Sequence, residues 1–395
     1  MSTTDQAPSP ARWTALRGLD RVNWSSYGIL VGIIVIGIAF NAMTGGLFLS
    51  PRNVTLLAVQ AVILGMAACG MVLIMVSGHI DLSVGSAVGL TTTITVYTQV
   101  TFHWSAPAAI VAALVVGLLI GIWQGTWIAV TGIPAFVVTL AGMTLLRGVT
   151  YLVTNGQTFA PVSPGMAQIA NGFIDPHFSL ILIVVAAAIY IGARLAQFVR
   201  RSGASRVEER PSLARELGRA IPLVVVFGIV LYIALSYQGI PYAVLVLAAV
   251  ALGLSFIAMR TRFGRHLYAM GGGKEAALLA GINVARNTFA VFVGMGLIYG
   301  LAGVVLASRL NGAPPDPALG LELQAITAVI IGGTSLMGGV GTIQGAILGA
   351  VLLTSINNGM DLMGLSSYLQ FVVEGLILLL AVLLDRLLKR RRGAA

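Results

Sequence analysis

Charged residues are scarce in this chain. Only 9% of its 395 residues are charged, whereas about a quarter are charged in a typical soluble protein. Because 57% of the residues are apolar, a surface of ordinary polarity is excluded and most of the surface must face lipid. A backbone in lipid has to satisfy its own hydrogen bonds, which leaves only helices or a closed barrel. The apolar runs are long and do not alternate with polar residues, which favours helices.

The chain also has only one cysteine, no cluster of histidines and no nucleotide-binding motif. The single cysteine, Cys69, excludes a disulfide or a cysteine metal cluster within the chain. The four histidines lack metal-ligand spacing, and no serine stands in a GxSxG elbow. The stretch YAMGGGKEA has Tyr268 and Glu275 where a phosphate-binding loop needs Gly and then Ser or Thr. We therefore predict no metal site, no cofactor bound by this chain and no enzyme activity. Uphill transport would draw on an ion gradient or on a separate ATPase.

The net charge of +10 does not indicate nucleic-acid binding. The 23 Lys and Arg residues lie at the ends of apolar runs, without a basic stripe interleaved with aromatics. If the N-terminus is cytoplasmic and the runs alternate in direction, most of these residues fall on the cytoplasmic side, in the N-terminal tail, the insert at 200–219, the loop at 260–286 and the C-terminal tail. The loop 155–177 has no Lys or Arg, so it is expected outside.

These patterns predict an all-α, polytopic transmembrane helix bundle of about ten to twelve spans, some of them broken, with both termini cytoplasmic. Residues 1–26 and 389–395 are expected to form cytoplasmic tails around a transmembrane domain at 27–388. The basic insert at 200–219 would be a solvated loop, or would bind acidic lipid or a partner. The apolar runs lie at 27–43, 54–77, 83–99, 107–130, 134–154, 178–199, 221–237, 242–259, 287–308, 321–335, 343–359 and 367–385.

Two glycine-rich breaks interrupt the apolar sequence, one in each half of the chain. They read SGHIDLSVGSAVGL at 77–90 and IGGTSLMGGVGTIQGAILGAVLL at 331–353. Paired interruptions are typical of an internal repeat around a translocation path, although small residues can also simply let helices pack closely. The candidate helix-break or pathway residues are Asp81, Ser83, Gly85, Ser86, Gly332, Gly333, Thr334 and, further along, Asn357.

Asp81 stands out because a charge facing lipid costs about 2.5–3.5 kcal/mol or more. It precedes the apolar run at 83–99 and is followed by Ser83. A carboxylate near a helix start can cap free backbone N–H groups, and an acidic group within the membrane can also line a path. Both interpretations place Asp81 away from lipid.

The segment KEAALLA, at 274–280, predicts a helix of about two turns between glycines. So short a helix is marginal alone in water, which indicates that it docks into a partner. The alternative is a helical loop that lies on the membrane surface.

Several motifs in this sequence resemble the permeases of ABC importers. Glu275, Ala276 and Ala277, followed by Gly281, match the EAA signature of those permeases. Four further motifs resemble the sugar-permease branch, which includes the ribose and xylose permeases. They are IDLSVGS at 80–86, IGGTSLMGGVGT at 331–342, VTLAGMTLLRG at 138–148 and NNGM at 357–360. The length of the chain and its basic insert are most similar to those of the xylose permeases.

The resemblance implies a permease subunit of the bacterial inner membrane that imports a monosaccharide. The similarity to xylose permeases implies that this monosaccharide is xylose. It implies a homodimer of permeases, a periplasmic sugar-binding protein and a cytoplasmic ATP-binding subunit that holds ATP and Mg. The implied coupling residues are Gly271, Gly272, Glu275, Ala276, Ala277 and Gly281. Two alternatives stay open: the same machinery for another monosaccharide or small polar solute, and an ion-coupled secondary carrier.

Overall fold

The computed structural model describes residues 24–204, 228–232 and 234–393. Most of the predicted N-terminal tail, residues 205–219 of the basic insert, the start of the run at 221–237 and the last two residues lie outside these ranges. Within them the chain forms helices and two isolated β-bridges, Phe159 to Ala313 and Phe173 to Pro241. The predicted all-α fold class is confirmed.

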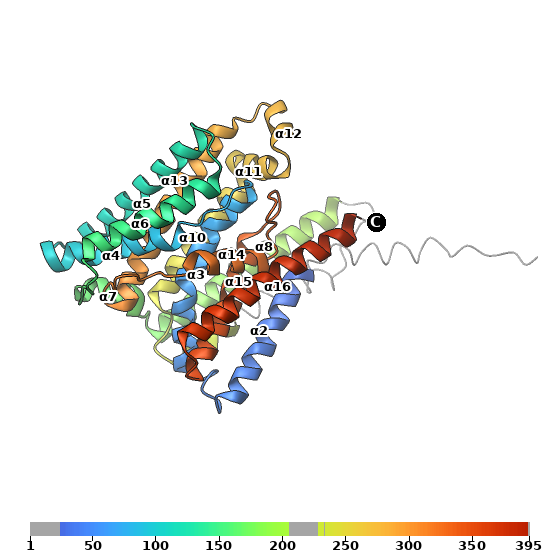
Figure 1. The fold of residues 1–395 in the computed structure, drawn as a ribbon. Helices are drawn as coiled ribbons and strands as arrows, with labels where there is room; N and C mark the ends of the chain where they lie inside the picture. The colour runs from blue at the N-terminus through green and yellow to red at the C-terminus, as the bar shows by residue number, and fades with distance from the viewer. Residues whose placement is uncertain (1–23, 205–227, 233, 394–395) are drawn as a thin grey trace, which may run out of the picture.

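Long helices run along one another, with the short α11 and α12 at one end of the bundle, which we call the coupling end (Figure 1). The helices are α2 (Trp24–Met43), α3 (Pro51–Val76), α4 (Val84–Phe102), α5 (Ala106–Ala129), α6 (Ala135–Thr154), α7 (Pro164–Asn171), α8 (Pro176–Ala204), α10 (Tyr242–Arg260), α11 (Arg262–Gly272), α12 (Lys274–Leu279), α13 (Val284–Leu310), α14 (Leu321–Ile331), α15 (Ile343–Leu362) and α16 (Ser367–Gly393).

Six of the described helices are long and apolar enough to cross a membrane. They are α3, α5, α6, α10, α13 and the Ser367–Leu384 part of α16, and three shorter apolar helical stretches lie at Gly28–Met43, Pro176–Gly192 and Leu321–Ile331. Every predicted apolar run except 221–237 coincides with one helix, so the polytopic architecture is confirmed. The orientation of the termini stays a prediction.

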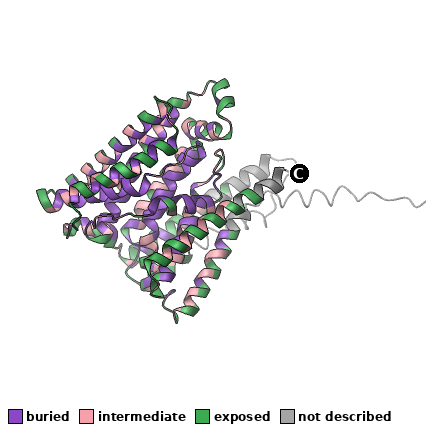
Figure 2. Ribbon diagram, in the orientation of Figure 1, coloured by how far each residue is buried: buried purple, intermediate pink, exposed green. Residues whose placement is uncertain are grey.

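Helix α3 forms the centre of the bundle. In its most apolar stretch 94% of the residues are buried. The helix contacts α10, α13, α14 and α15. The buried residues concentrate on α3 and its neighbours, while the outer helices carry exposed residues (Figure 2). A helix that is apolar all round belongs inside, and the outer helices cover it from lipid.

Three helices that begin at the coupling end are each capped by the side chain of the residue just before the helix. The side-chain oxygens of Thr261, Asn283 and Thr342 accept hydrogen bonds from the backbone N–H three residues further on, at 3.1, 2.9 and 3.1 Å. Such caps satisfy donors that a helix start leaves free. They fix where α11, α13 and α15 begin, and so position the loops at this end.

Helices α5 and α13 approach so closely that only glycine fits between them. A Cβ at Gly296 would overlap the carbonyl oxygen of Gly117 and lie 3.2 Å from the Cα of Gly121. Small residues at crossings of this kind let membrane helices reach backbone contact. This contact holds α13, whose first residues follow α12, in a fixed position against α5.

Replacing Gly296 with alanine should therefore destabilise the bundle. Overpacking of a tight contact costs about 1–3 kcal/mol, which lowers the melting temperature of the protein in detergent. The matched control is Gly294→Ala on the same helix, where an added Cβ meets nothing within 4 Å. Equal melting temperatures of the two variants would contradict the packing explanation.

Candidate functional site

Both helix breaks meet the end of α11. The amide of Gly339, in the break before α15, donates a hydrogen bond to the carbonyl oxygen of Val76 at the end of α3, at 2.9 Å. The hydroxyl of Tyr268 on α11 donates to the carbonyl oxygen of Gly341 at 2.7 Å. Burial raises the pKa of Tyr268 above its ordinary value, so the hydroxyl keeps the proton that this bond needs. These bonds fasten α11 and α3 to the second break.

Four glycines bring the three backbones into direct contact: Gly78, Gly271, Gly338 and Gly339. We call this group the glycine junction. A Cβ at Gly338 would lie 2.8 Å from the Cα of Gly271 and 3.1 Å from the Cα of Gly78. A Cβ at Gly271 would overlap the carbonyl oxygen of Val76 and lie 2.5 Å from the amide nitrogen of Gly339. No side chain separates the three backbones at the junction.

Left-handed backbone is a second reason for glycine here. The φ angles of Gly78, Gly338 and Gly339 are +85°, +86° and +72°, a region that residues with a Cβ rarely adopt. The two helix breaks predicted from the sequence are thus present, and they converge with α11 on one point.

Helix α12 places its predicted coupling residues on two different faces. Glu275 and Ala276 are exposed, whereas Ala277 is buried against the rest of the chain. Leu279, the last residue of the helix, has 91% of its surface exposed. Lys274 and Leu278 are exposed too, but they line a cavity behind the helix. The outer face of α12 therefore consists of Glu275, Ala276 and Leu279, with Ala277 anchoring the helix.

The predicted glycines of this segment also differ in their surroundings. Gly271 belongs to the glycine junction, but a Cβ at its neighbour Gly272 would meet nothing within 4 Å. Gly281, which follows α12, has a φ of +76° and open space around it. A cavity of about 1100 Å³ lies between α12, the first helix break and the α5–α6 connection. It leaves room behind α12 for that helix to move.

Asp81 is completely buried and is held by three donors. One carboxylate oxygen accepts from the amide and the hydroxyl of Ser83, at 2.8 and 2.7 Å, and the other accepts from the hydroxyl of Tyr299 on α13. Gln124 on α5 donates to the Ser83 hydroxyl at 2.5 Å. The network satisfies one backbone N–H at the break, that of Ser83, and ties the break to α5 and α13.

Sequence reasoning missed Gln124 and Tyr299. Each is a polar group within a long apolar helix, and this was the only available signal. Nothing in the spacing along the chain indicated that Tyr299, 218 residues away, would reach Asp81.

Replacing Asp81 with asparagine should leave much of the transport, because the amide oxygen can still accept from Ser83. Replacement with leucine removes every acceptor and leaves buried donors unpaired, at a cost of about 1–3 kcal/mol each, so the protein should misfold. Folded yield by size-exclusion chromatography and sugar uptake check both variants. Two well-folded, inactive proteins would contradict the capping account.

The other predicted break residues contact several different elements and do not form one site. Gly85 packs against Glu322 and the carbonyl oxygen of Ala318, which brings α14 onto α4, and Gly332 packs against Gly345 at the crossing of α14 and α15. Gly333 turns the chain with a φ of +86°. The hydroxyls of Ser86 and Thr334 are buried without a hydrogen-bond partner among the described residues. Asn357 lies on α15, where its amide donates to Glu374 of α16 at 2.6 Å.

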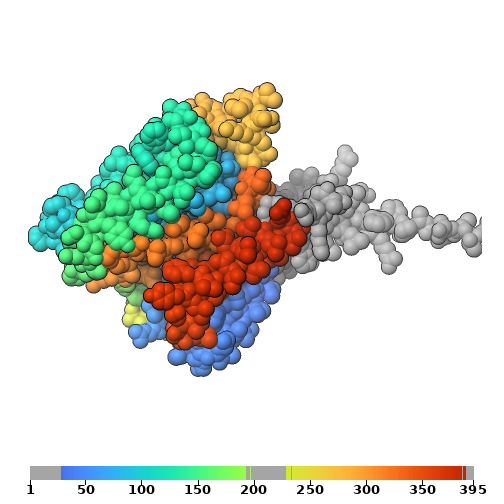
Figure 3. Space-filling model, in the orientation of Figure 1, coloured from blue at the N-terminus to red at the C-terminus, as the bar shows by residue number. Residues whose placement is uncertain are grey.

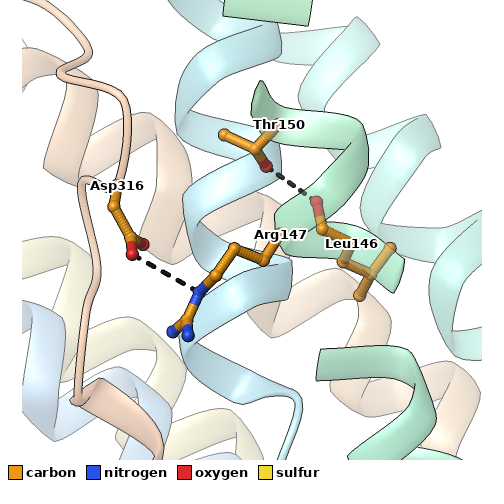
Figure 4. Close-up of polar contacts among 4 residues, drawn as sticks. All are labelled: Leu146, Arg147, Thr150 and Asp316. Atoms are coloured by element: carbon orange, nitrogen blue, oxygen red, sulfur yellow. Dashed lines mark hydrogen bonds and ion pairs between the residues drawn. The ribbon is translucent and has the colours of Figure 1, made fainter. Parts of the chain in front are cut away.

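An ion pair lies on one side of the bundle. The Nε of Arg147, on α6, is 3.4 Å from a carboxylate oxygen of Asp316 in the segment before α14 (Figure 4). Both side chains are partly exposed, at 30% and 23%, and α6 is one of the candidate membrane spans. Charged groups at membrane depth face protein or water rather than lipid. The Arg147–Asp316 pair therefore faces protein or water. On the side of the molecule shown in Figure 3, α6 and α16 flank segments near α14.

Comparison with known proteins places these features in a family. The family model described as "Branched-chain amino acid transport system / permease component" matches residues 53–382. The xylose transport system permease protein of Escherichia coli K12 is 40% identical, over 95% of this chain and 95% of that protein. The corresponding protein of Haemophilus influenzae is 38% identical, over 94% of this chain and 99% of that protein. The ribose import permease protein of Escherichia coli K12 is 33% identical, over 90% and 92%.

No solved structure gives a significant match to the chain. The resemblance to ABC importer permeases inferred from the motifs is confirmed by the family match and by these identities. With a polytopic helical fold and a family match over most of its length, the chain belongs to the branched-chain amino acid transport system permease family and is a multi-pass membrane permease of ABC importer type.

Proposed function

We propose that this chain forms the membrane path of a binding-protein-dependent importer that carries xylose across the bacterial inner membrane. The observation that carries this proposal is the arrangement of α12. It exposes Leu279 at the coupling end, and the glycine junction behind it touches both helix breaks. A chain without a nucleotide motif needs a motor outside itself, and this helix offers that motor a contact.

In this proposal a cytoplasmic ATPase, which holds ATP and Mg, docks on the face formed by Glu275, Ala276 and Leu279. Both termini and the coupling end lie in the cytoplasm. ATP-driven closure of the ATPase displaces α12, and the glycine junction passes that displacement to the two breaks as a rigid-body movement. A periplasmic sugar-binding protein delivers the cargo at the opposite end.

A second copy of the permease completes the path. The Arg147–Asp316 pair supports this part of the proposal, because a partly exposed ion pair at membrane depth needs protein or water in front of it. A homodimer that faces its partner with this side would cover the pair and enclose a polar path between the copies.

The identity of the sugar rests on the relatives named as xylose permeases, and reconstitution tests it. The permease is placed in liposomes with its ATPase and its binding protein, and uptake of labelled xylose, ribose and glucose is compared. ATP-dependent accumulation of xylose ahead of the other sugars is the expected result. If another sugar accumulates ahead of xylose, that sugar takes the place of xylose in the proposal. Accumulation by the permease alone would indicate an ion-coupled carrier.

A further inference from the structure

The cavity of about 1100 Å³ behind α12 lies at the level of a membrane surface. Four of the described candidate spans end or begin beside it. Its lining includes the residue that follows α3, the last residues of α5, and the first residues of α6 and α13. Because the apolar part of a span matches the hydrocarbon of the bilayer, these ends place the cavity where lipid headgroups meet water.

Most of the cavity wall is apolar. Phe136 on α6, Leu278 on α12 and Met337 in the second helix break are 55%, 53% and 80% exposed. Water against such a wall is unfavourable, and apolar residues gathered around one cavity are typical of a binding site. The occupant should therefore bring an apolar part. The larger apolar residues of the wall include Ile128, Ile133, Phe136, Met270, Leu278 and Met337.

The charge of the cavity has one sign. Among the described residues of the lining, Lys274 alone is charged, and none of them carries a carboxylate. Glu275, the next residue, is exposed on the outer face of α12 and does not line the cavity. Asp81, close by in the first break, is buried and already accepts from Ser83 and Tyr299. The occupant should therefore bring a negative charge for Lys274.

His79 provides a neutral hydrogen-bonding group in the same lining. Burial and the charge of Lys274 lower the pKa of His79 to about 4, so its ring is uncharged at neutral pH. The Nε2 of His79 lies 3.3 Å from the hydroxyl oxygen of Thr288, which also lines the cavity. A phosphate accepts hydrogen bonds from both charged and neutral donors. Basic pockets between membrane helices on the cytoplasmic side are typical sites for lipid headgroups.

From these observations we propose that the cavity binds an anionic phospholipid of the cytoplasmic leaflet, with its phosphate at Lys274 and its acyl chains against the apolar wall. The lipid site does not depend on which sugar is carried. It rests on the proposed function for the cytoplasmic location of the coupling end and for the role of α12. Acyl chains are fluid, so this occupant covers the wall and still lets α12 move, whereas a close-packed protein segment would hold the helix in place.

Thiol labelling of the full-length permease in vesicles tests the site. Leu278→Cys places a thiol in the cavity lining. Leu279→Cys places one on the outer face of α12, and the native Cys69 is fully buried. An uncharged, water-soluble maleimide is present on both sides of the membrane. Phosphatidylglycerol mixed into phosphatidylcholine vesicles should slow the reaction of Leu278→Cys, and it should leave the reaction of Leu279→Cys unchanged.

Charge variants identify the headgroup contact. Lys274→Gln, added to Leu278→Cys, should raise the fraction of phosphatidylglycerol needed for protection about fivefold, as expected when one attraction between a lysine and an anionic headgroup is lost. Lys274→Arg should keep the protection. Arg262→Gln removes an exposed cation of α11 that does not line the cavity, so the protection should stay the same. This control separates the cavity from a general attraction between the coupling end and an anionic surface.

Three results would overturn the lipid site. They are an equal reaction of Leu278→Cys in both kinds of vesicle, protection that Lys274→Gln leaves unchanged, and a slow reaction in every vesicle, which would mean that another part of the chain fills the cavity. Xylose uptake by the complete complex is measured in the same vesicles. If xylose accumulates with ATP although the lipid site fails, the proposed function stands. If phosphatidylglycerol protects the thiol but no sugar accumulates, the proposed function fails and the lipid site stands.

Discussion

Replacing Leu279 with aspartate should abolish both the assembly of this permease with its ATPase and sugar uptake. Leu279 is the most exposed large apolar residue at the coupling end, so the substitution leaves the bundle intact. Burying a leucine side chain contributes about 1.5–3 kcal/mol to a contact, and an isolated carboxylate in the same place adds a desolvation penalty. The affinity for the ATPase should therefore fall about a hundredfold or more.

Co-purification of the ATPase with tagged permease measures this effect. Leu279→Met is the matched control, because it keeps an apolar side chain of similar volume, and it should retain the ATPase. The melting temperature of the isolated permease should be the same in both variants. A Leu279→Asp permease that still retains its ATPase would show that α12 is not the docking element.

Replacing Gly271 with alanine should uncouple ATP hydrolysis from transport. An added Cβ there overlaps the carbonyl oxygen of Val76 and crowds the amide of Gly339, so the end of α11 has to move away from both breaks. The outer face of α12 is untouched, and the ATPase should stay bound. We expect the sugar moved per ATP to fall about tenfold, as for a lost coupling of about 1.4 kcal/mol.

The adjacent glycine provides the comparison for this experiment. Gly272→Ala adds the same methyl group one residue later, where nothing lies within 4 Å. Uptake and ATP hydrolysis by the two variants are measured side by side in liposomes. If Gly272→Ala impairs coupling as much as Gly271→Ala, the glycine junction is not the route by which α12 acts on the breaks.

The sequence predicted the elements of this protein well and its contacts poorly. The spans were readable because lipid demands long apolar runs, and α12 was readable because glycines bound a strong helix-forming segment. The faces of α12 were not readable, since two turns of helix carry too little periodicity to show that Ala277 lies inward and Leu279 outward.

By itself, the sequence determined that this chain is a helical membrane bundle of a known permease family, without a nucleotide motif of its own. Hydropathy and short motifs suffice for that, because each is a local property. Only the tertiary structure decided that Gly78, Gly271 and Gly338 meet, and that Tyr299 reaches Asp81. Contacts between distant segments depend on how all the helices pack together, and no single stretch of the chain contains that information.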